Sequence, residues 1–277
     1  MTQSNKPTVA LALGGGGVRG LAHLGVLKVL EREQIPIAGI AGTSAGGLIG
    51  AAYASGMEVD EIEEEIMRIA TPTELIKFLD IGFLKGVGLI TGSRIRGYLE
   101  TLLGKDLLFS DLKIPFVTNA VCLDCCDEVI LREGSVVGAM RASMSIPGVF
   151  APVEWDDCRL VDGGVLNNLP ADLAGEFGAD AVIAVDVSMR ALEVARSEET
   201  SSIFTLSLAN DLWQTVSIMT DKFADLRLAA AQPDVIVRPI IPFSVSMFSG
   251  FGQAADVIAA GMNAAEAALP EIEKALA

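Results

Sequence analysis

Ser44 is the residue of this sequence best placed to act as a nucleophile. It stands in Gly42-Thr43-Ser44-Ala45-Gly46, a G-x-S-x-G pentapeptide between an apolar stretch at 35–42 and a run of small residues at 45–56. A strand, a sharp turn and a helix in this order present an exposed serine hydroxyl above a sheet, and only small neighbours fit the turn. Gly42 and Gly46 are therefore predicted to form a nucleophile elbow. A turn of small residues without any chemistry is the alternative.

A serine nucleophile needs a base that takes its proton. His23 is the single histidine and falls early in an expected helix at 21–33, where we expect a packed or locally hydrogen-bonded ring. A Ser-His-Asp triad is therefore disfavoured. Asp162 is the preferred base, because the stretch Arg159–Pro170 stops a strand at Asp-Gly-Gly and is expected to leave this carboxylate on an exposed turn. The alternative is an Asp-Gly turn with no catalytic part.

A glycine-rich loop, G-x-G-x-x-G, begins at Gly15 and follows an apolar strand expected at Thr8–Leu13. A dinucleotide site of this kind needs an acidic residue about 20 positions further on. Residues 34–53 contain no Asp or Glu, so this use is disfavoured. A phosphate-binding P-loop would need Lys-Ser or Lys-Thr after the glycines, and neither pair is present.

The remaining use of the loop is an oxyanion hole. Backbone N–H groups of Gly15, Gly16 and Gly17 would point at developing negative charge, with a helix N-terminus behind them. Arg19 either steadies this loop or a bound acyl group, or it faces solvent as an ion-pair residue.

The order of expected elements favours an α/β fold, because the chain opens with strand, helix, strand, helix. One domain spanning 1–277 is expected, with a motif-bearing core at about 8–190 and a C-terminal strand and helices at 201–277. Further strands are expected at 114–122, 128–131, 153–155, 159–161, 181–187 and 234–239. Further helices are expected at 59–69, 93–103, 136–145, 201–231 and 254–269, the last ended by Pro270.

Four stretches together resemble the patatin-like phospholipase family, in the family's order. They are GGGVRG from Gly15, GTSAG from Gly42, RASMSIP from Arg141 and DGGVLNNLP from Asp162. The likeness is greatest to compact bacterial members, which also resemble the esterase domain of neuropathy target esterase. It implies a three-layer α/β/α fold with a mostly parallel central sheet. It also implies a Ser-Asp dyad, with Ser44 as nucleophile and Asp162 as proton acceptor.

The same resemblance implies hydrolysis of acyl esters in phospholipids or lysophospholipids through an acyl-enzyme, without a metal or other cofactor. Transfer of the acyl group to another lipid is one alternative function. A non-catalytic lipid-binding regulatory protein on the same fold is another.

The net charge of −16 over 277 residues argues against nucleic-acid partners, which need a basic surface. It also disfavours electrostatic docking on anionic lipid. The N-terminus is polar, and no run of about 18 uncharged apolar residues occurs. We expect a cytoplasmic protein, with transient contact to a membrane surface as a further expectation. The apolar segments 81–90 and 243–251 either form a lid or membrane-contacting edge, or cover the core.

Four cysteines are expected to be buried free thiols in a reducing compartment: Cys122, Cys125, Cys126 and Cys158. A structural zinc site needs four ligands at well-formed spacing. The only histidine lies in another segment, so no metal site is expected.

Overall fold

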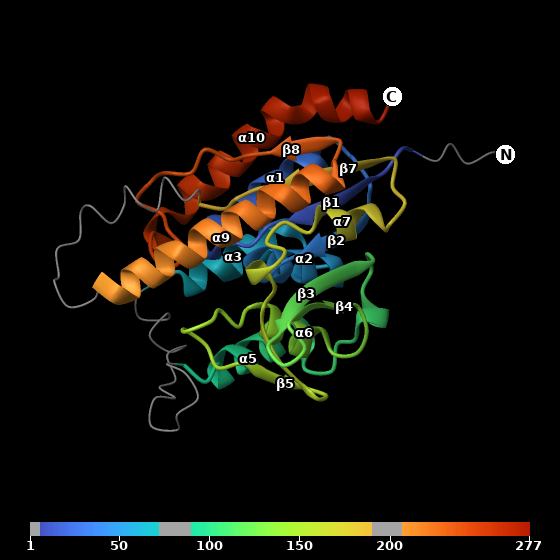
Figure 1. The fold of residues 1–277 in the computed structure, drawn as a ribbon. Coiled ribbons are helices and arrows are strands. Elements are labelled where there is room, and N and C mark those ends of the chain that lie inside the picture. Colours follow the sequence, from blue (N-terminus) through green and yellow to red (C-terminus); the bar gives the residue numbers. More distant parts are fainter. Residues whose placement is uncertain (1–5, 72–89, 190–206) are drawn as a thin grey trace.

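The computed structural model describes residues 6–71, 90–189 and 207–277 (Figure 1). Within these residues an eight-stranded sheet has the order β5-β6-β3-β2-β1-β7-β8, with β4 paired to β3. The strands are β1 Val9–Leu13, β2 Ile37–Gly42, β3 Phe116–Cys122, β4 Asp127–Leu131, β5 Val153–Trp155, β6 Cys158–Asp162, β7 Ala181–Val185 and β8 Val235–Val237. The run from β3 through β2, β1 and β7 to β8 is parallel. Antiparallel pairing adds β4, β5 and β6, so the sheet is mostly parallel, as predicted.

Helices cover both faces of this sheet (Figure 1). They are α1 Ala22–Arg32, α2 Ser44–Ser55, α3 Val59–Ile69, α5 Ser93–Leu99, α6 Val136–Ser143, α7 Ala171–Gly175, α9 Ser207–Ala231 and α10 Ala254–Ala275. Alternate side chains of β1 enter two different cores. Leu11 and Leu13 pack with residues of α1, α2 and α10, whereas Ala10 and Ala12 pack with residues of α7 and α9. This division confirms the predicted three-layer α/β/α fold.

The register of three neighbouring strands sets the geometry of the site. Gly42, the last residue of β2, is paired with Thr118 of β3. Thr118 and Ala120 both pair with β4 as well, so β4 occupies one edge of β3, and β2 and β6 share the other edge. On this shared edge the antiparallel strand β6 pairs its last residue, Asp162, with Ala120. Ala120 lies two residues beyond Thr118, and Ser44 lies two residues beyond Gly42. The C-terminal ends of β2 and β6 therefore face each other along one edge of β3, and this brings Ser44 and Asp162 together.

The end of α10 differs from the prediction. Pro270 was expected to end the closing helix, but this is wrong, because α10 continues through it to Ala275. A proline inside a helix costs about 3 kcal/mol or more. Ile272 is fully buried in the core that α10 shares with α1, and burying an isoleucine contributes about 1.5–3 kcal/mol. Packing of the last turns offsets much of the cost of the proline.

The apolar segment 81–90 falls outside the described residues, apart from Ile90. None of the helices in the described ranges is long and apolar enough to cross a membrane.

Candidate active site

Ser44 is the first residue of α2, directly after the end of β2. Its φ of 52° lies in the left-handed region, which residues with a side chain rarely adopt. Such strain costs about 1–3 kcal/mol and persists only where the surroundings impose it. Here the Ser44 N–H donates to Oγ of Ser143 at 3.0 Å. The strained turn is therefore held by a side chain from α6.

The glycines on either side of Ser44 have no room for a side chain. A Cβ on Gly46 would lie 2.2 Å from the carbonyl oxygen of Leu13. A Cβ on Gly42 would lie 2.7 Å from the Cα of Gly47. These contacts are to backbone, which cannot move aside cheaply. They give the steric reason for glycine at both positions of the predicted elbow.

Asp162 ends β6, and its Oδ1 accepts the N–H of Gly164 at 2.8 Å. Burial raises the pKa of this carboxyl group from 3.8 to about 6. Hydrogen bonds from the Gly164 N–H and from the Ser44 hydroxyl oppose that rise. The arrangement leaves a carboxylate that is ionised at neutral pH and is more basic than an aspartate in water.

Both side chains were expected at exposed positions, and this is wrong. Ser44 is 8% exposed and Asp162 is 6% exposed. The turn after Asp162 is pressed against β3, since a Cβ on Gly163 would lie 2.3 Å from Oδ1 of Asn119. The Asp-Gly-Gly turn thus packs into the sheet instead of standing free of it.

The glycine loop lies beside Ser44, because a Cβ on Gly15 would be 3.1 Å from Cβ of Ser44. The Gly15 N–H already donates to the carbonyl of Asn168 at 2.9 Å. Its amide is therefore occupied, which goes against its predicted place among the oxyanion donors. The N–H groups of Gly16 and Gly17 have no acceptor within the part of the chain that the structure describes. They are the two donors of the predicted set that remain available.

Arg19 supports this loop from within. Its guanidinium is buried and donates to the carbonyls of Val187 at 2.9 Å and of Ser188 and Val245 at 3.3 Å. The expected alternative of a solvent-facing residue is wrong. Arg19 joins the glycine loop to the segment that follows β7 and to the segment around Val245.

His23 lies in the first turn of α1 and is fully buried. Its Nε2 is 2.8 Å from the carbonyl of Gly14, which can only accept, so this nitrogen carries the proton. Burial lowers the pKa of His23 to about 4, so the ring is neutral at physiological pH. The ring holds the start of the glycine loop, in agreement with the local hydrogen bond that the sequence predicted.

Several supporting residues were not predicted. Thr118 Oγ1 donates to the Gly42 carbonyl at 2.7 Å and lies 3.0 Å from Ser143 Oγ. Thr43 Oγ1 donates to Oδ1 of Asn119 at 2.8 Å. Ser143 falls within the RASMSIP stretch, so this motif could have indicated that Ser143 lies near the site. Thr118 and Asn119 lie in an apolar strand without a recognisable pattern.

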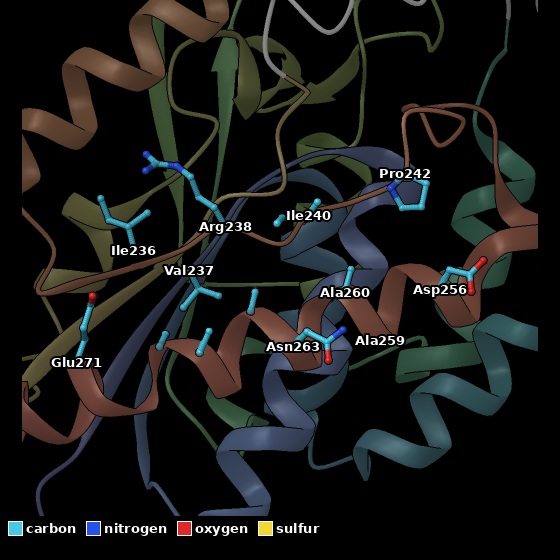
Figure 2. A pocket seen from close by; sticks show the side chains of 13 residues that line it. Ile236, Val237, Arg238, Ile240, Pro242, Asp256, Ala259, Ala260, Asn263 and Glu271 are labelled. Carbon is cyan, nitrogen blue, oxygen red and sulfur yellow. The ribbon is translucent and has the colours of Figure 1, made fainter.

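A surface hollow of about 610 Å³ lies elsewhere, between β8, the segment after it and α10 (Figure 2). Val237 lines it from β8, Ile240 and Pro242 from the following segment, and Asn263 from α10. Neither Ser44 nor Asp162 is among its lining residues. The hollow is therefore separate from the elbow and the glycine loop.

The cysteines differ from their predicted burial. Cys122 is buried, as expected, and Cys158 is half-buried. Cys125 and Cys126 are exposed, because both lie in the turn between β3 and β4 and not in either strand.

The fold and the site together define a three-layer α/β/α protein with a serine elbow, a glycine-rich loop and a buried carboxylate beside the serine. Residues 11–174 match the patatin-like phospholipase family, and the chain belongs to this family. Patatin-like phospholipase domain-containing protein 6 of Homo sapiens is 33% identical over 221 residues, which cover 78% of this chain and 16% of that protein.

An NTE family protein of Mycobacterium tuberculosis is 33% identical over 218 residues, or 79% of this chain. The match spans 59% of that relative's length. Among solved structures, VipD from Legionella pneumophila has a similar fold, with a TM-score of 0.53 at 11% identity. That match covers 96% of this chain and 67% of VipD.

Proposed function

We propose that this chain is a serine hydrolase that cleaves acyl esters of phospholipids or lysophospholipids, with Ser44 as nucleophile and Asp162 as its base. The observation that carries the proposal is the buried contact between the Ser44 hydroxyl and the Asp162 carboxylate. The lone histidine supports it indirectly, because the proton on its Nε2 is committed to the Gly14 carbonyl. Membership of the patatin-like phospholipase family supports a lipid ester as substrate.

The reaction proceeds in two steps. Asp162 takes the hydroxyl proton while Ser44 attacks the ester carbonyl, and the alcohol leaves with that proton. Water, deprotonated by Asp162, then attacks the acyl-enzyme. The fatty acid is released as Ser44 takes that proton back from Asp162. The N–H groups of Gly16 and Gly17 hold the oxyanion in both steps, and one such donor is typically worth about 3 kcal/mol.

The substrate reaches this site beside the segment 243–251. This segment adjoins the glycine loop, since the Val18 N–H donates to the Met247 carbonyl at 3.2 Å. Phe243 is 61% exposed and Phe248 is 51% exposed, whereas Val245 is buried. The segment thus has a buried anchor and two exposed aromatic rings. We place its contact with a lipid surface at these rings.

The test of the chemistry uses purified protein with p-nitrophenyl esters and lysophospholipids. Ser44→Ala should lower kcat/KM by at least about a thousandfold. Asp162→Asn should lower it by at least about a hundredfold. Asp157→Asn, in the exposed turn before β6, is the matched control and should leave activity unchanged. Full activity in either Ser44→Ala or Asp162→Asn would exclude the dyad.

Two further measurements separate the alternative functions. A fluorophosphonate probe should label Ser44, and a protein that only binds lipid would stay unlabelled. Fatty acid should appear without an added acceptor lipid, whereas an acyltransferase would need one.

The test of membrane contact is flotation with vesicles of zwitterionic phosphatidylcholine, because the net charge of −16 disfavours anionic lipid. The double variant Phe243→Ser, Phe248→Ser should float less than the parent protein. Met67→Ser, an exposed apolar residue of α3, is the control and should float like the parent. Equal flotation of the double variant would exclude contact through the rings.

A further inference from the structure

Three cysteine sulfurs gather at the end of the sheet where β3, its following turn and β6 meet. Cys122 is the last residue of β3, Cys125 lies in the turn, and Cys158 is the first residue of β6. Their Sγ atoms all lie within 4.8 Å of one another. The sequence shows only the C-x-x-C pair, and antiparallel pairing of β6 with β3 adds the third thiol.

The turn is already folded around the sulfur of Cys122. The Cys125 N–H donates to Sγ of Cys122 at 3.2 Å, and the Cys126 N–H donates to the Cys122 carbonyl at 3.0 Å. An N–H group directed at a sulfur stabilises its thiolate form, which is the form that binds metals. The thiol of Cys126 takes no part in the cluster, because its Sγ is directed to the Leu123 carbonyl.

An ion pair fixes the turn to β6 independently of the sulfurs. The Asp124 carboxylate accepts the backbone N–H of Arg159 at 2.8 Å and also its guanidinium Nη2 at 2.8 Å. The Leu123 N–H donates to the Arg159 carbonyl at 2.9 Å. Cys125 and Cys158, adjacent to the paired residues Asp124 and Arg159, are thereby held near one another. The three sulfurs are therefore held close together before a metal ion binds, so binding needs little further ordering of the chain.

We propose that Cys122, Cys125 and Cys158 bind one thiophilic metal ion of the Zn²⁺ type as three thiolate ligands. A tetrahedral ion with Zn–S bonds of about 2.3 Å places its sulfurs about 3.8 Å apart. This separation fits the three Sγ atoms, which lie within 4.8 Å of one another. The fourth position is open to water, because Cys125 is exposed.

This site is separate from the ester chemistry. Asp162 lies four residues along β6 from Cys158, or about 13 Å. A bound ion would fasten the β3–β4 turn to the strand that carries Asp162. A ligand that binds only the folded state raises its stability, so the ion should raise the melting temperature.

The experiment uses the full chain, reduced with a phosphine and freed of metal with a chelator. Zn²⁺ is added, the excess is removed, and bound metal is counted by elemental analysis. Cd²⁺ serves as a second probe, because its thiolate bonds give an ultraviolet charge-transfer band. One Zn²⁺ per chain, a higher melting temperature and the Cd²⁺ band are the expected results.

Three variants locate the ligands. Cys125→Ser and Cys158→Ser are chosen because neither residue is fully buried, and each should weaken Zn²⁺ binding at least about tenfold. Cys126→Ser is the matched control and should bind Zn²⁺ like the parent protein. The proposal is overturned if the reduced parent binds no Zn²⁺, or if Cys158→Ser binds it equally well. It is also overturned if Cys126→Ser loses as much affinity as Cys125→Ser.

Discussion

The Ser44 hydroxyl meets the Asp162 carboxylate where the C-terminal ends of β2 and β6 face each other along one edge of β3. The two residues come from strands that run in opposite directions, since β2 is parallel to β3 and β6 is antiparallel to it. The contact therefore depends on where β6 ends. A shift of two residues in the β3–β6 register would move Asp162 about 7 Å along the strand, out of reach of Ser44.

Activity should depend on the protonation of Asp162. Its pKa of about 6 means that the carboxylate is ionised above this pH and accepts the Ser44 proton, whereas the acid form below it cannot. We expect kcat/KM to fall tenfold per pH unit below about pH 6 and to reach a plateau above pH 7. A pH–rate profile with a soluble p-nitrophenyl ester checks this. A profile that stays flat down to pH 4.5 would contradict Asp162 as the base.

Removal of the Ser143 hydroxyl should impair the elbow without touching substrate. Ser143→Ala leaves the buried N–H of Ser44 without its acceptor, which costs about 1–3 kcal/mol. We expect kcat to fall about 10- to 100-fold, with labelling by a fluorophosphonate slowed in parallel. Ser55→Ala is the control. It removes a hydroxyl that donates to the Ala52 carbonyl at the far end of α2, the helix that begins at Ser44. Equal activity in both variants would show that Ser143 does not position Ser44.

Substitution of Gly46 should disrupt the elbow, whereas another helical glycine should tolerate a methyl group. A Cβ on Gly46 would overlap the Leu13 carbonyl, so Gly46→Ala forces β1 and α2 apart. We expect loss of activity and a large fall in melting temperature. Gly97→Ala in α5, where a Cβ meets nothing within 4 Å, should instead stabilise the protein by up to about 1 kcal/mol. Thermal unfolding of both variants distinguishes a steric effect from a general cost of replacing glycine.

How far the sequence predicted the site depends on how local each interaction is. Ser44 could be singled out as the candidate nucleophile because a G-x-S-x-G turn is specified by five consecutive residues. Asp162 was chosen as the candidate base partly by elimination and partly from the Asp-Gly-Gly strand end. Its burial was missed because it depends on how the next residue, Gly163, packs against Asn119 of a distant strand. The hydrogen bond of the Gly15 N–H was also missed. Its acceptor is the backbone carbonyl of Asn168, and because every residue has such a carbonyl, the sequence does not indicate which one accepts.

The fold was predictable for a related reason. Parallel strands and covering helices follow from apolar periodicity within each segment, so the three layers emerged from local patterns. The position of β6 did not, because strand order and register are set by contacts between distant segments. The same limit applies to the cysteines, since nothing near Cys158 in the sequence indicates that it meets Cys122.

Stability should respond to pH in opposite directions at His23 and Asp162. The pKa of His23 falls from 6.5 to about 4 on folding, so its contribution is present above pH 6.5 and is lost as pH falls towards 4. The pKa of Asp162 rises from 3.8 to about 6, so its contribution is present below pH 3.8 and is lost as pH rises through 6. Each change is worth on the order of 3 kcal/mol, and the two largely cancel between pH 4 and 6.

Single variants should therefore expose the two opposing trends. His23→Gln removes the histidine contribution and keeps that of Asp162. Its unfolding free energy should therefore rise as pH falls from 6 to 4, whereas that of the parent protein stays nearly constant. In Asp162→Asn the destabilising effect of His23 protonation stays, so unfolding free energy should fall over the same interval. Urea unfolding at several pH values measures both slopes. If both variants follow the parent protein, neither group carries the shifted pKa that its burial implies.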